Sequence, residues 1–199
     1  NTIFPALMAG NAVLLKHAPN VPGVALAIEK LFWAADFPEG SFQSLLIDVP
    51  TTENLIRDPR ISGLTLTGSP SAGRRAASIA GESLKKCVLE LGGSDPFVVL
   101  EDAPVEEAVE TAVKARIQNS GQTCIAAKRL IVHRKHLAYF EEALPRKFKA
   151  LALGDPLDSK TEVGPLARKD LRDALHAQVQ DSVKLGAKIL CGGKEVAGP

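Results

Sequence analysis

Cys124 is the residue of this 199-residue sequence whose type and setting suit nucleophilic chemistry best. It stands in "NSGQTCIAAKR", shortly after the pair Ser120-Gly121 and before a short apolar pattern that opens at Arg129. A thiol that is accessible and has a lowered pKa attacks carbonyl carbons, whereas a lone buried cysteine is an inert small hydrophobe. Gly121 allows a strained, exposed turn at this point, which favours the reactive alternative and leaves the structural one open.

Glu90 is the candidate for a general base. In "KCVLELGG" it ends an apolar strand pattern directly before two glycines. Such a setting predicts a partly desolvated carboxylate with a raised pKa, while the alternative is a strand residue that faces solvent. The glycines permit close approach of another backbone or of a cofactor, which favours a site.

The segment "GLTLTGSPSAGRR" carries a possible phosphate-binding turn. A strand is expected to end at Thr67, Gly68 permits a tight turn, and Ser69 and Pro70 suit the N-cap and first position of a helix. The free N–H groups of that helix would favour an anion such as a dinucleotide pyrophosphate. The spacing from Gly68 to Gly73 is not the G-x-G-x-x-G fingerprint, so the segment taken alone favours an ordinary capped helix over a phosphate site.

Lys16 closes the first predicted strand. The carboxyl edge of an α/β sheet is where such folds bind their ligands, and a lysine there is able to hydrogen-bond a ribose hydroxyl. A solvated lysine at a strand end is the alternative.

Short β-type runs alternate with longer segments of helical period, which predicts an α/β fold with a mostly parallel sheet covered by helices. The predicted strands are 13–16, 42–48, 63–67, 86–91, 97–101, 129–133 and 187–191. The predicted helices are 20–35, 51–58, 69–84, 104–118, 135–151 and 166–185.

Composition points to a globular protein that binds a small molecule. The net charge is +1, with 45% hydrophobic and 24% charged residues, so no strong field would collect nucleic acid or an anionic membrane. There is no apolar run near the roughly 20 residues of a membrane span and no basic-apolar leader, which predicts a cytoplasmic protein. Cys87, Cys124 and Cys191 lie far apart, which argues against disulfides and closely spaced metal ligands. The first and last residues resemble the interior of a fold, so we expect a piece of a longer enzyme.

Three motifs in order, "LTLTGSPSAG", "LELGGSDPFVVLEDA" and "NSGQTC", resemble the aldehyde dehydrogenase superfamily. The likeness covers essentially the whole chain and is closest to bacterial succinate-semialdehyde dehydrogenases, through "LLKHAPNVPG" and "CIAAKR". It implies the end of a Rossmann-like NAD(P)-binding domain at 1–92 and the beginning of an α/β catalytic domain at 93–199. It also implies a homo-oligomer, dimer or tetramer, in the full-length protein.

The resemblance implies oxidation of an aldehyde to the acid through a cysteine thiohemiacetal and thioester, with NAD or NADP as the cofactor. Cys124 would be the nucleophile, its backbone N–H an oxyanion donor, and Glu90 the base that activates water. The residues implied at the cofactor are Lys16, Thr67, Gly68, Ser69, Gly73, Leu91 and Gly92.

Two departures from the family bear on specificity. Pro19 stands where members often carry an acidic residue or one that tolerates a phosphate, which leaves NAD against NADP open. Gln118 stands where some succinate-semialdehyde enzymes hold the substrate carboxylate with arginine.

The alternatives to an active aldehyde dehydrogenase are a non-catalytic nucleotide-binding relative, an inactive fragment, or a cofactor-free cysteine hydrolase. The hydrolase would need a histidine partner, which the sequence does not indicate for Cys124.

Overall fold

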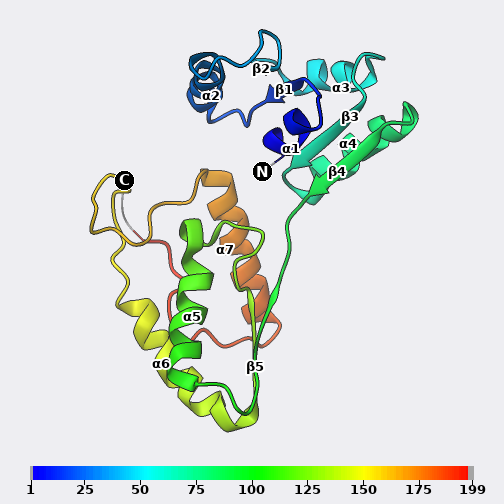
Figure 1. Ribbon diagram of the computed structural model, residues 1–199. Helices are drawn as coiled ribbons and strands as arrows, with labels where there is room; N and C mark the ends of the chain where they lie inside the picture. The colour runs from blue at the N-terminus through cyan, green and yellow to red at the C-terminus, as the bar shows by residue number, and fades with distance from the viewer. Residues whose placement is uncertain (1, 197–199) are drawn as a thin grey trace. The chain divides into compact units, whose positions relative to one another are not determined.

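The structure is a computed structural model that describes residues 2–196 (Figure 1). The chain divides into two compact units, Asn1–Leu91 and Gly92–Pro199. The strands pair in parallel, β1 with β2, β3 with β4 and β5 with β6, in keeping with the parallel α/β class expected from the sequence. Their bounds are Val13–Lys16 (β1), Phe42–Leu45 (β2), Gly63–Thr67 (β3), Lys86–Glu90 (β4), Pro96–Val99 (β5) and Arg129–Val132 (β6).

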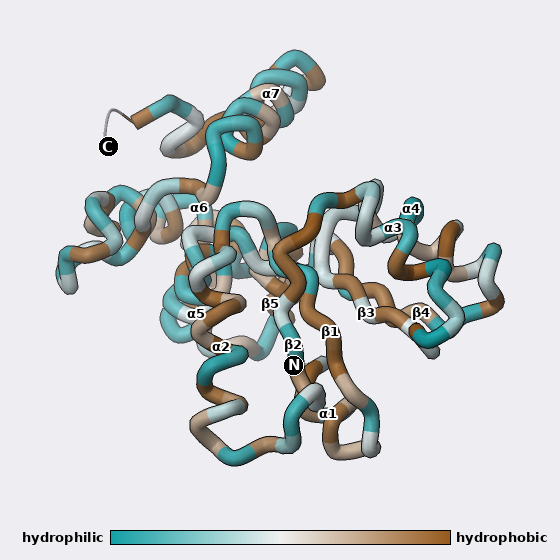
Figure 2. Tube along the Cα trace, turned by 90° about the horizontal axis from the view of Figure 1, so that it is seen from above, coloured by the Kyte–Doolittle hydropathy of each residue, from teal (hydrophilic) through white to brown (hydrophobic). Residues whose placement is uncertain are grey.

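In the first unit each pair of parallel strands is joined through a helix, because parallel neighbours require a crossover connection. The helices of this unit are Ile3–Met8 (α1), Pro22–Ala34 (α2), Val49–Arg57 (α3) and Pro70–Glu82 (α4). Helix α2 connects β1 to β2, and α4 connects β3 to β4. Strand β1 is drawn as a largely hydrophobic segment in Figure 2, as expected for a strand that packs under a helix.

Aromatic stacking fixes α2 on β2. The ring of Phe32 stacks on that of Phe42 with centroids 4.6 Å apart, and Phe37 meets Phe32 edge-on at 4.9 Å. Phe32 and Phe42 are buried, and each such side chain contributes roughly 1.5–3 kcal/mol by leaving water. The amide of Ser44 in β2 donates to the buried carboxylate of Glu29 in α2, which ties the same two elements by a polar contact.

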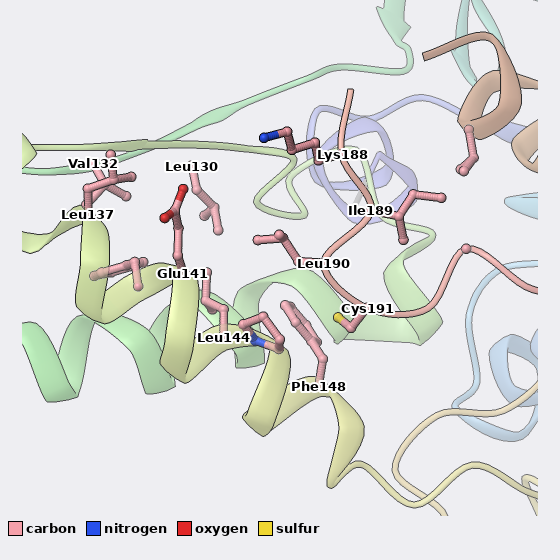
Figure 3. Close-up of a pocket in the computed structure, with 14 residues that line it drawn as sticks. Leu130, Val132, Leu137, Glu141, Leu144, Phe148, Lys188, Ile189, Leu190 and Cys191 are labelled. Carbon is pink, nitrogen blue, oxygen red and sulfur yellow. The ribbon is translucent and has the colours of Figure 1, made fainter. Parts of the chain in front are cut away.

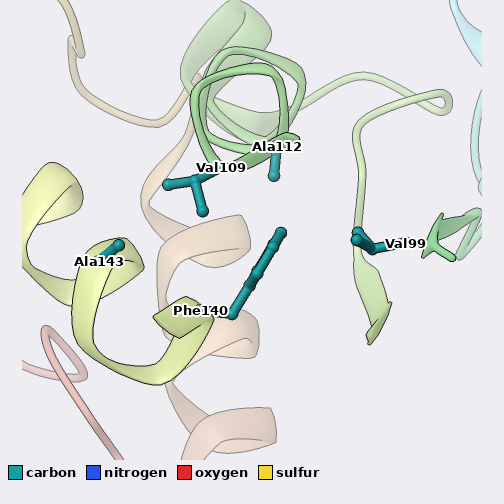
Figure 4. Packing of buried hydrophobic residues seen from close by; sticks show 5 residues of the cluster. All are labelled: Val99, Val109, Ala112, Phe140 and Ala143. Atoms are coloured by element: carbon teal, nitrogen blue, oxygen red, sulfur yellow. The ribbon is translucent and has the colours of Figure 1, made fainter. Parts of the chain in front are cut away.

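The second unit contains Val105–Ile117 (α5), the 3₁₀ turn Gln118–Gly121 (η1), Arg134–Lys149 (α6) and Lys169–Lys184 (α7). Helices α5 and α6 lie side by side in Figure 1. Figure 4 shows Phe140 of α6 among the small side chains of this core. The buried cluster consists of Val99, Val109, Ala112, Phe140 and Ala143.

A long loop between α6 and α7 is closed at its base. Leu153 and Val163 form an isolated parallel bridge. The amides of Glu162 and Val163 both donate to the carbonyl of Ala152, and the Glu162 carboxylate accepts from the Ala152 amide at 2.9 Å. Residues 154–162 therefore leave and re-enter the fold at one place.

The strand bounds 63–67 predicted from the sequence are those observed for β3. The predicted strand at 187–191 is wrong, because these residues have no regular structure and pair with no strand among the described residues. A strand exists only with a partner that takes its backbone hydrogen bonds, and an apolar run does not reveal whether one is present. Helix α1 was not predicted from the sequence; it contains Pro5 in its first turn, where a missing N–H costs little.

No helix within residues 2–196 has both the length and the apolar character that crossing a membrane requires.

Candidate active site

The turn after β3 is built by local hydrogen bonds. Thr67 stands opposite Glu90 in the parallel ladder, and the amide of Gly68 donates to the Glu90 carbonyl at 2.9 Å. Ser69 then caps α4, its hydroxyl accepting from the amide of Ala72 at 3.2 Å, with Pro70 as the first helical residue. The helix therefore begins where the sequence predicted.

Gly73 brings α4 close to the end of β4. The residue is buried, and a Cβ placed on it would lie 2.6 Å from Cδ2 and 2.8 Å from Cδ1 of Leu91. No larger residue fits there unless the Leu91 side chain or the helix moves. Gly73 and Leu91 thus determine how closely the capped end of the helix approaches the strand edge.

The first turn of α4 is suited to an anion. It carries no acidic side chain, so the unsatisfied amides and the positive end of the helix dipole are not neutralised from within the helix. Arg75, in the same helix, is turned to the carboxylate of Glu53, with Nε 2.8 Å from Oε1. Its hydrogen bonds hold the pKa of Glu53 below the ordinary value of that group.

Lys16 ends β1, opposite Leu45 of β2. Its ammonium is partly buried and donates to the carbonyl of His17 at 2.8 Å. Hydrogen bonds from Thr51 hold the pKa of Asp48 below its usual range, and the charge of Lys16 adds a smaller contribution in the same direction. The lysine head is thus held beside its own strand end rather than extended into solvent.

Glu90 is the last residue of β4, and its side chain is exposed. The strand alternates, so that Cys87 and Leu89 are half-buried on one face while Glu90 shares the other face with Val88. The desolvation of Glu90 expected from the apolar sequence around it is therefore not observed. An alternating strand exposes every second residue, and the run of apolar letters concealed this alternation.

Cys124 is a free, exposed cysteine in the second unit. It occupies the first central position of a β-turn, in which the amide of Ala126 donates to the carbonyl of Thr123 at 3.3 Å. Just before it, Asn119 and Ser120 have φ angles of 51° and 55°, in the left-handed region that non-glycine residues rarely adopt. The strained turn that the sequence indicated around Gly121 therefore extends over three residues, since Gly121 itself has φ 78°.

The side chains of Arg116 and Gln122 hold this backbone, and neither was predicted from the sequence. Arg116 of α5 donates from Nη1 to the carbonyl of Gly121 at 3.2 Å. Gln122 donates to the carbonyl of Asn119 at 3.2 Å and accepts from the amide of Ala167 at 2.9 Å. In the sequence, only the proximity of these two residues to Cys124 points to them. Hydrogen bonds from a side chain to a turn carbonyl produce no repeating pattern of residues.

The glycines after β4 divide between two settings. Gly92 is exposed and opens the second unit. Gly93 approaches the cysteine turn, since a Cβ on it would lie 3.5 Å from the carbonyl oxygen of Cys124 and 3.2 Å from the Asp95 carboxylate. The close backbone approach predicted for this pair is thus found at Gly93.

A pocket of about 510 Å³ lies elsewhere in the second unit, between α6 and the irregular segment 188–193 (Figure 3). Leu144 and Phe148 of α6 line it, together with Ile189, Leu190 and Cys191 of the irregular segment. None of the predicted site residues lines it. Within residues 2–196 no three His, Cys, Asp or Glu side chains are grouped closely enough to hold a metal ion.

Comparison with known proteins shows to which family the chain belongs. Residues 1–199 match the aldehyde dehydrogenase family. The chain belongs to this family. The α/β fold with a Rossmann-like first portion is confirmed, because the chain superposes on solved members of the family with TM-scores above 0.9.

Succinate-semialdehyde dehydrogenases are among the curated relatives of the chain. The chain is 52% identical over 195 residues to "Succinate-semialdehyde dehydrogenase [NADP(+)]" of Mycobacterium avium, covering 98% of the chain and 41% of the relative. It is also 52% identical to the probable NADP(+) enzyme of Synechocystis, covering 98% of the chain and 43% of that relative. The chain thus spans about two fifths of the length of the curated relatives it matches.

Solved structures of the family include both nicotinamide cofactors. Succinic semialdehyde dehydrogenase from Streptococcus pyogenes, solved with NADP+, matches with TM-score 0.94 and 35% identity, over 98% of this chain and 43% of that one. Aldehyde dehydrogenase C of Pseudomonas syringae, a C291A mutant solved with NAD+ and octanal, matches with TM-score 0.93 and 32% identity, over 98% and 40%.

Proposed function

We propose that the whole protein is an NAD(P)+-dependent aldehyde dehydrogenase, with succinate semialdehyde as the first candidate substrate. The observation that carries the proposal is the setting of Cys124, an exposed thiol on a strained turn. Among the described residues its own amide N–H donates to no acceptor. One residue then offers both a nucleophile and a hydrogen-bond donor for the oxygen that becomes negative.

Cys124 begins the reaction. Its thiolate attacks the aldehyde carbon and forms a C–S bond, the carbonyl π bond becomes an oxygen lone pair, and the resulting tetrahedral thiohemiacetal carries its negative charge on that oxygen. The Cys124 amide stabilises that oxyanion, a role worth about 10²–10³ in rate for a well-placed donor. The same amide serves the second tetrahedral species, when water attacks the thioester.

The residues proposed to hold the cofactor are Lys16, Thr67, Gly68, Ser69, Gly73, Leu91 and Gly92. Their arrangement suits a dinucleotide, because the capped end of α4 lacks acidic side chains and Gly73 permits the helix to lie close to the strand edge. Bound NAD(P)+ would supply the hydride acceptor, so that oxidation leaves a thioester on Cys124. We assign these residues to the cofactor domain (1–92) and Cys124 to the catalytic domain (93–199).

Glu90 is proposed as the general base for thioester hydrolysis. Its exposed carboxylate has direct access to water, and at the end of β4 it adjoins the proposed cofactor turn. By accepting a proton from the attacking water it would release the carboxylic acid and the free thiol.

Cofactor and substrate preference follow from two residues and from the relatives. Pro19 places no carboxylate three positions after Lys16, so nothing there repels a 2′-phosphate, and we propose that NADP+ is accepted. The relatives named for NADP(+) support the same choice. Gln118 is exposed and uncharged, so a succinate-semialdehyde carboxylate would need a cation from elsewhere in the whole protein.

The test is the rate of cofactor reduction by the whole protein with NADP+ and NAD+, for succinate semialdehyde and for uncharged aldehydes. Cys124→Ala should abolish reduction, whereas Cys191→Ala, outside the proposed site, should retain it. Glu90→Gln should release about one equivalent of reduced cofactor quickly and then turn over 10²–10⁴-fold more slowly. A Cys124→Ala protein that reduces cofactor at the parental rate refutes the mechanism.

A non-catalytic nucleotide-binding relative is not favoured, because the chain keeps both Cys124 and Glu90. We extend the proposal to a cytoplasmic homo-oligomer, dimer or tetramer, which light scattering of the whole protein tests directly.

A further inference from the structure

The ammonium of Lys128 is surrounded by carbonyl oxygens of the cysteine turn. Its Nζ lies 2.9 Å from the oxygen of Thr123, 2.9 Å from that of Cys124 and 3.3 Å from that of Ala126. An ammonium has three N–H donors, so its hydrogen-bonding capacity is fully used by one short stretch of backbone. Lys128 makes no ion pair among the residues that the structure describes.

These contacts determine where the neighbouring amides point. The described residues contain no cis peptide bond, and in a trans peptide the C=O of one residue and the N–H of the next point in opposite directions. Because the Thr123 carbonyl points to Lys128, the Cys124 N–H points away from it. The Ile125 N–H is directed away in the same manner by the Cys124 carbonyl.

Lys128 also keeps the Cys124 and Ile125 amides in this orientation, although the turn is exposed. The backbone before the turn is left-handed at Asn119 and Ser120, and the turn itself has a single long hydrogen bond, from Ala126 to Thr123. A peptide plane in such a segment rotates readily unless its carbonyl is held. Because three carbonyls bind the same ammonium, none of these peptide planes rotates without losing its hydrogen bond to Lys128.

We propose that Lys128 is a positioning residue that aims the Cys124 amide as the oxyanion donor. It touches neither substrate nor cofactor, and acts through the Thr123–Cys124 peptide plane. The inference rests on the proposed dehydrogenase function, because the oriented amide would stabilise the oxyanion that forms in that reaction. A lysine suits this role better than an arginine, because the planar fork of a guanidinium cannot converge on three carbonyls as an ammonium does.

The test compares Lys128→Met with Lys135→Met in the whole protein. Lys135 is the matched control, since its ammonium also donates to a carbonyl, that of Glu101, outside the turn. For Lys128→Met we expect kcat to fall about 10- to 100-fold with KM changed less than about threefold, the signature of an interaction made only in the transition state. Lys135→Met should stay within about twofold of the parent protein.

Alkylation of Cys124 by iodoacetamide separates positioning from an effect on the thiol, because alkylation develops no oxyanion. We expect the alkylation rate of Lys128→Met, followed over pH, to match that of the parent protein. A parallel fall in alkylation and turnover overturns the inference, since Lys128 would then act on the sulfur. Unchanged turnover in Lys128→Met overturns it as well.

Lys128→Arg retains the charge and guards against a variant that fails to fold. We expect kcat to remain reduced, and full recovery overturns the claim that three convergent donors are needed. If the parent protein oxidises no aldehyde, the proposed function fails. A crystal structure of Lys128→Met then tests the positioning alone, because an unrotated Thr123–Cys124 peptide contradicts it.

Discussion

The turn at 67–73 and the turn at 119–127 are both proposed to present backbone amides to a ligand, but different parts of the chain hold them. The first is stabilised by its own residues, with Ser69 as the cap and Pro70 at the first helical position. The second is held by Arg116 before it, Gln122 within it and Lys128 after it. A turn made from capping residues is recognisable in a sequence, whereas a turn held by side chains bonded to carbonyls is visible only in coordinates.

The largest expected effect is at Gly121, in the second turn. Gly121→Ala forces a side chain onto a residue with φ 78° and places a Cβ 3.2 Å from the Arg116 carbonyl. We expect a loss of about 2 kcal/mol in the free energy of unfolding, measured with urea. Gly10→Ala is the control for positive φ alone, since φ is 82° there and nothing lies within 4 Å. Equal losses in the two variants would show that the Arg116 contact is immaterial.

A smaller effect is expected at Gly73, in the first turn, where helix packing and helix propensity oppose each other. Gly73→Ala places a Cβ 2.6 Å from Leu91, and we expect a net loss of about 1 kcal/mol after the gain in propensity. Gly81→Ala, in the same helix with open space around it, should instead gain about 0.5–1 kcal/mol. Denaturation curves that move in the same direction for both variants would disprove the close contact.

Ser69→Ala tests how locally the first turn is encoded. Loss of the bond from the Ala72 amide should cost about 1 kcal/mol, and Ser69→Gly only a few tenths. Ser83→Ala is a suitable control, because Ser83 follows the same helix without capping its first turn. If Ser69→Ala leaves the unfolding midpoint unchanged, Pro70 and packing suffice to start α4.

The smallest effect is a pH dependence at the ion pair between Glu53 and Arg75. Arg75 lowers the pKa of Glu53 from 4.5, so the pair stabilises the folded chain above the unfolded-state pKa. This contribution disappears as the pH falls through the lower, folded-state pKa. The stability difference between the parent protein and Glu53→Gln should therefore be present at neutral pH and absent in strong acid, whereas exposed Glu39→Gln should show little difference at any pH. A difference for Glu53→Gln that persists unchanged in acid would contradict the shift.

The sequence predicted the parallel α/β class, the bounds of β3 and the start of α4, because alternation, caps and turn residues act locally. It did not predict the irregular path of 187–191, since a strand depends on a partner elsewhere in the fold. The exposure of Glu90 was only the alternative prediction, because apolar neighbours on both faces of a strand look alike in sequence. The roles of Arg116 and Lys128 were not predicted, because in a sequence a basic residue that binds carbonyls cannot be distinguished from one that faces solvent.

The hydrogen bond from the Ala167 amide to Gln122 restricts where residues are inserted or deleted in the loop between α6 and α7. Surface loops ordinarily gain and lose residues freely over evolutionary time. Here the Leu153–Val163 bridge closes 154–162 into a lobe whose length is able to vary without displacing the residues after the bridge. An insertion just beyond the bridge would instead shift Ala167 and release the glutamine, so length differences among homologues should concentrate within the lobe.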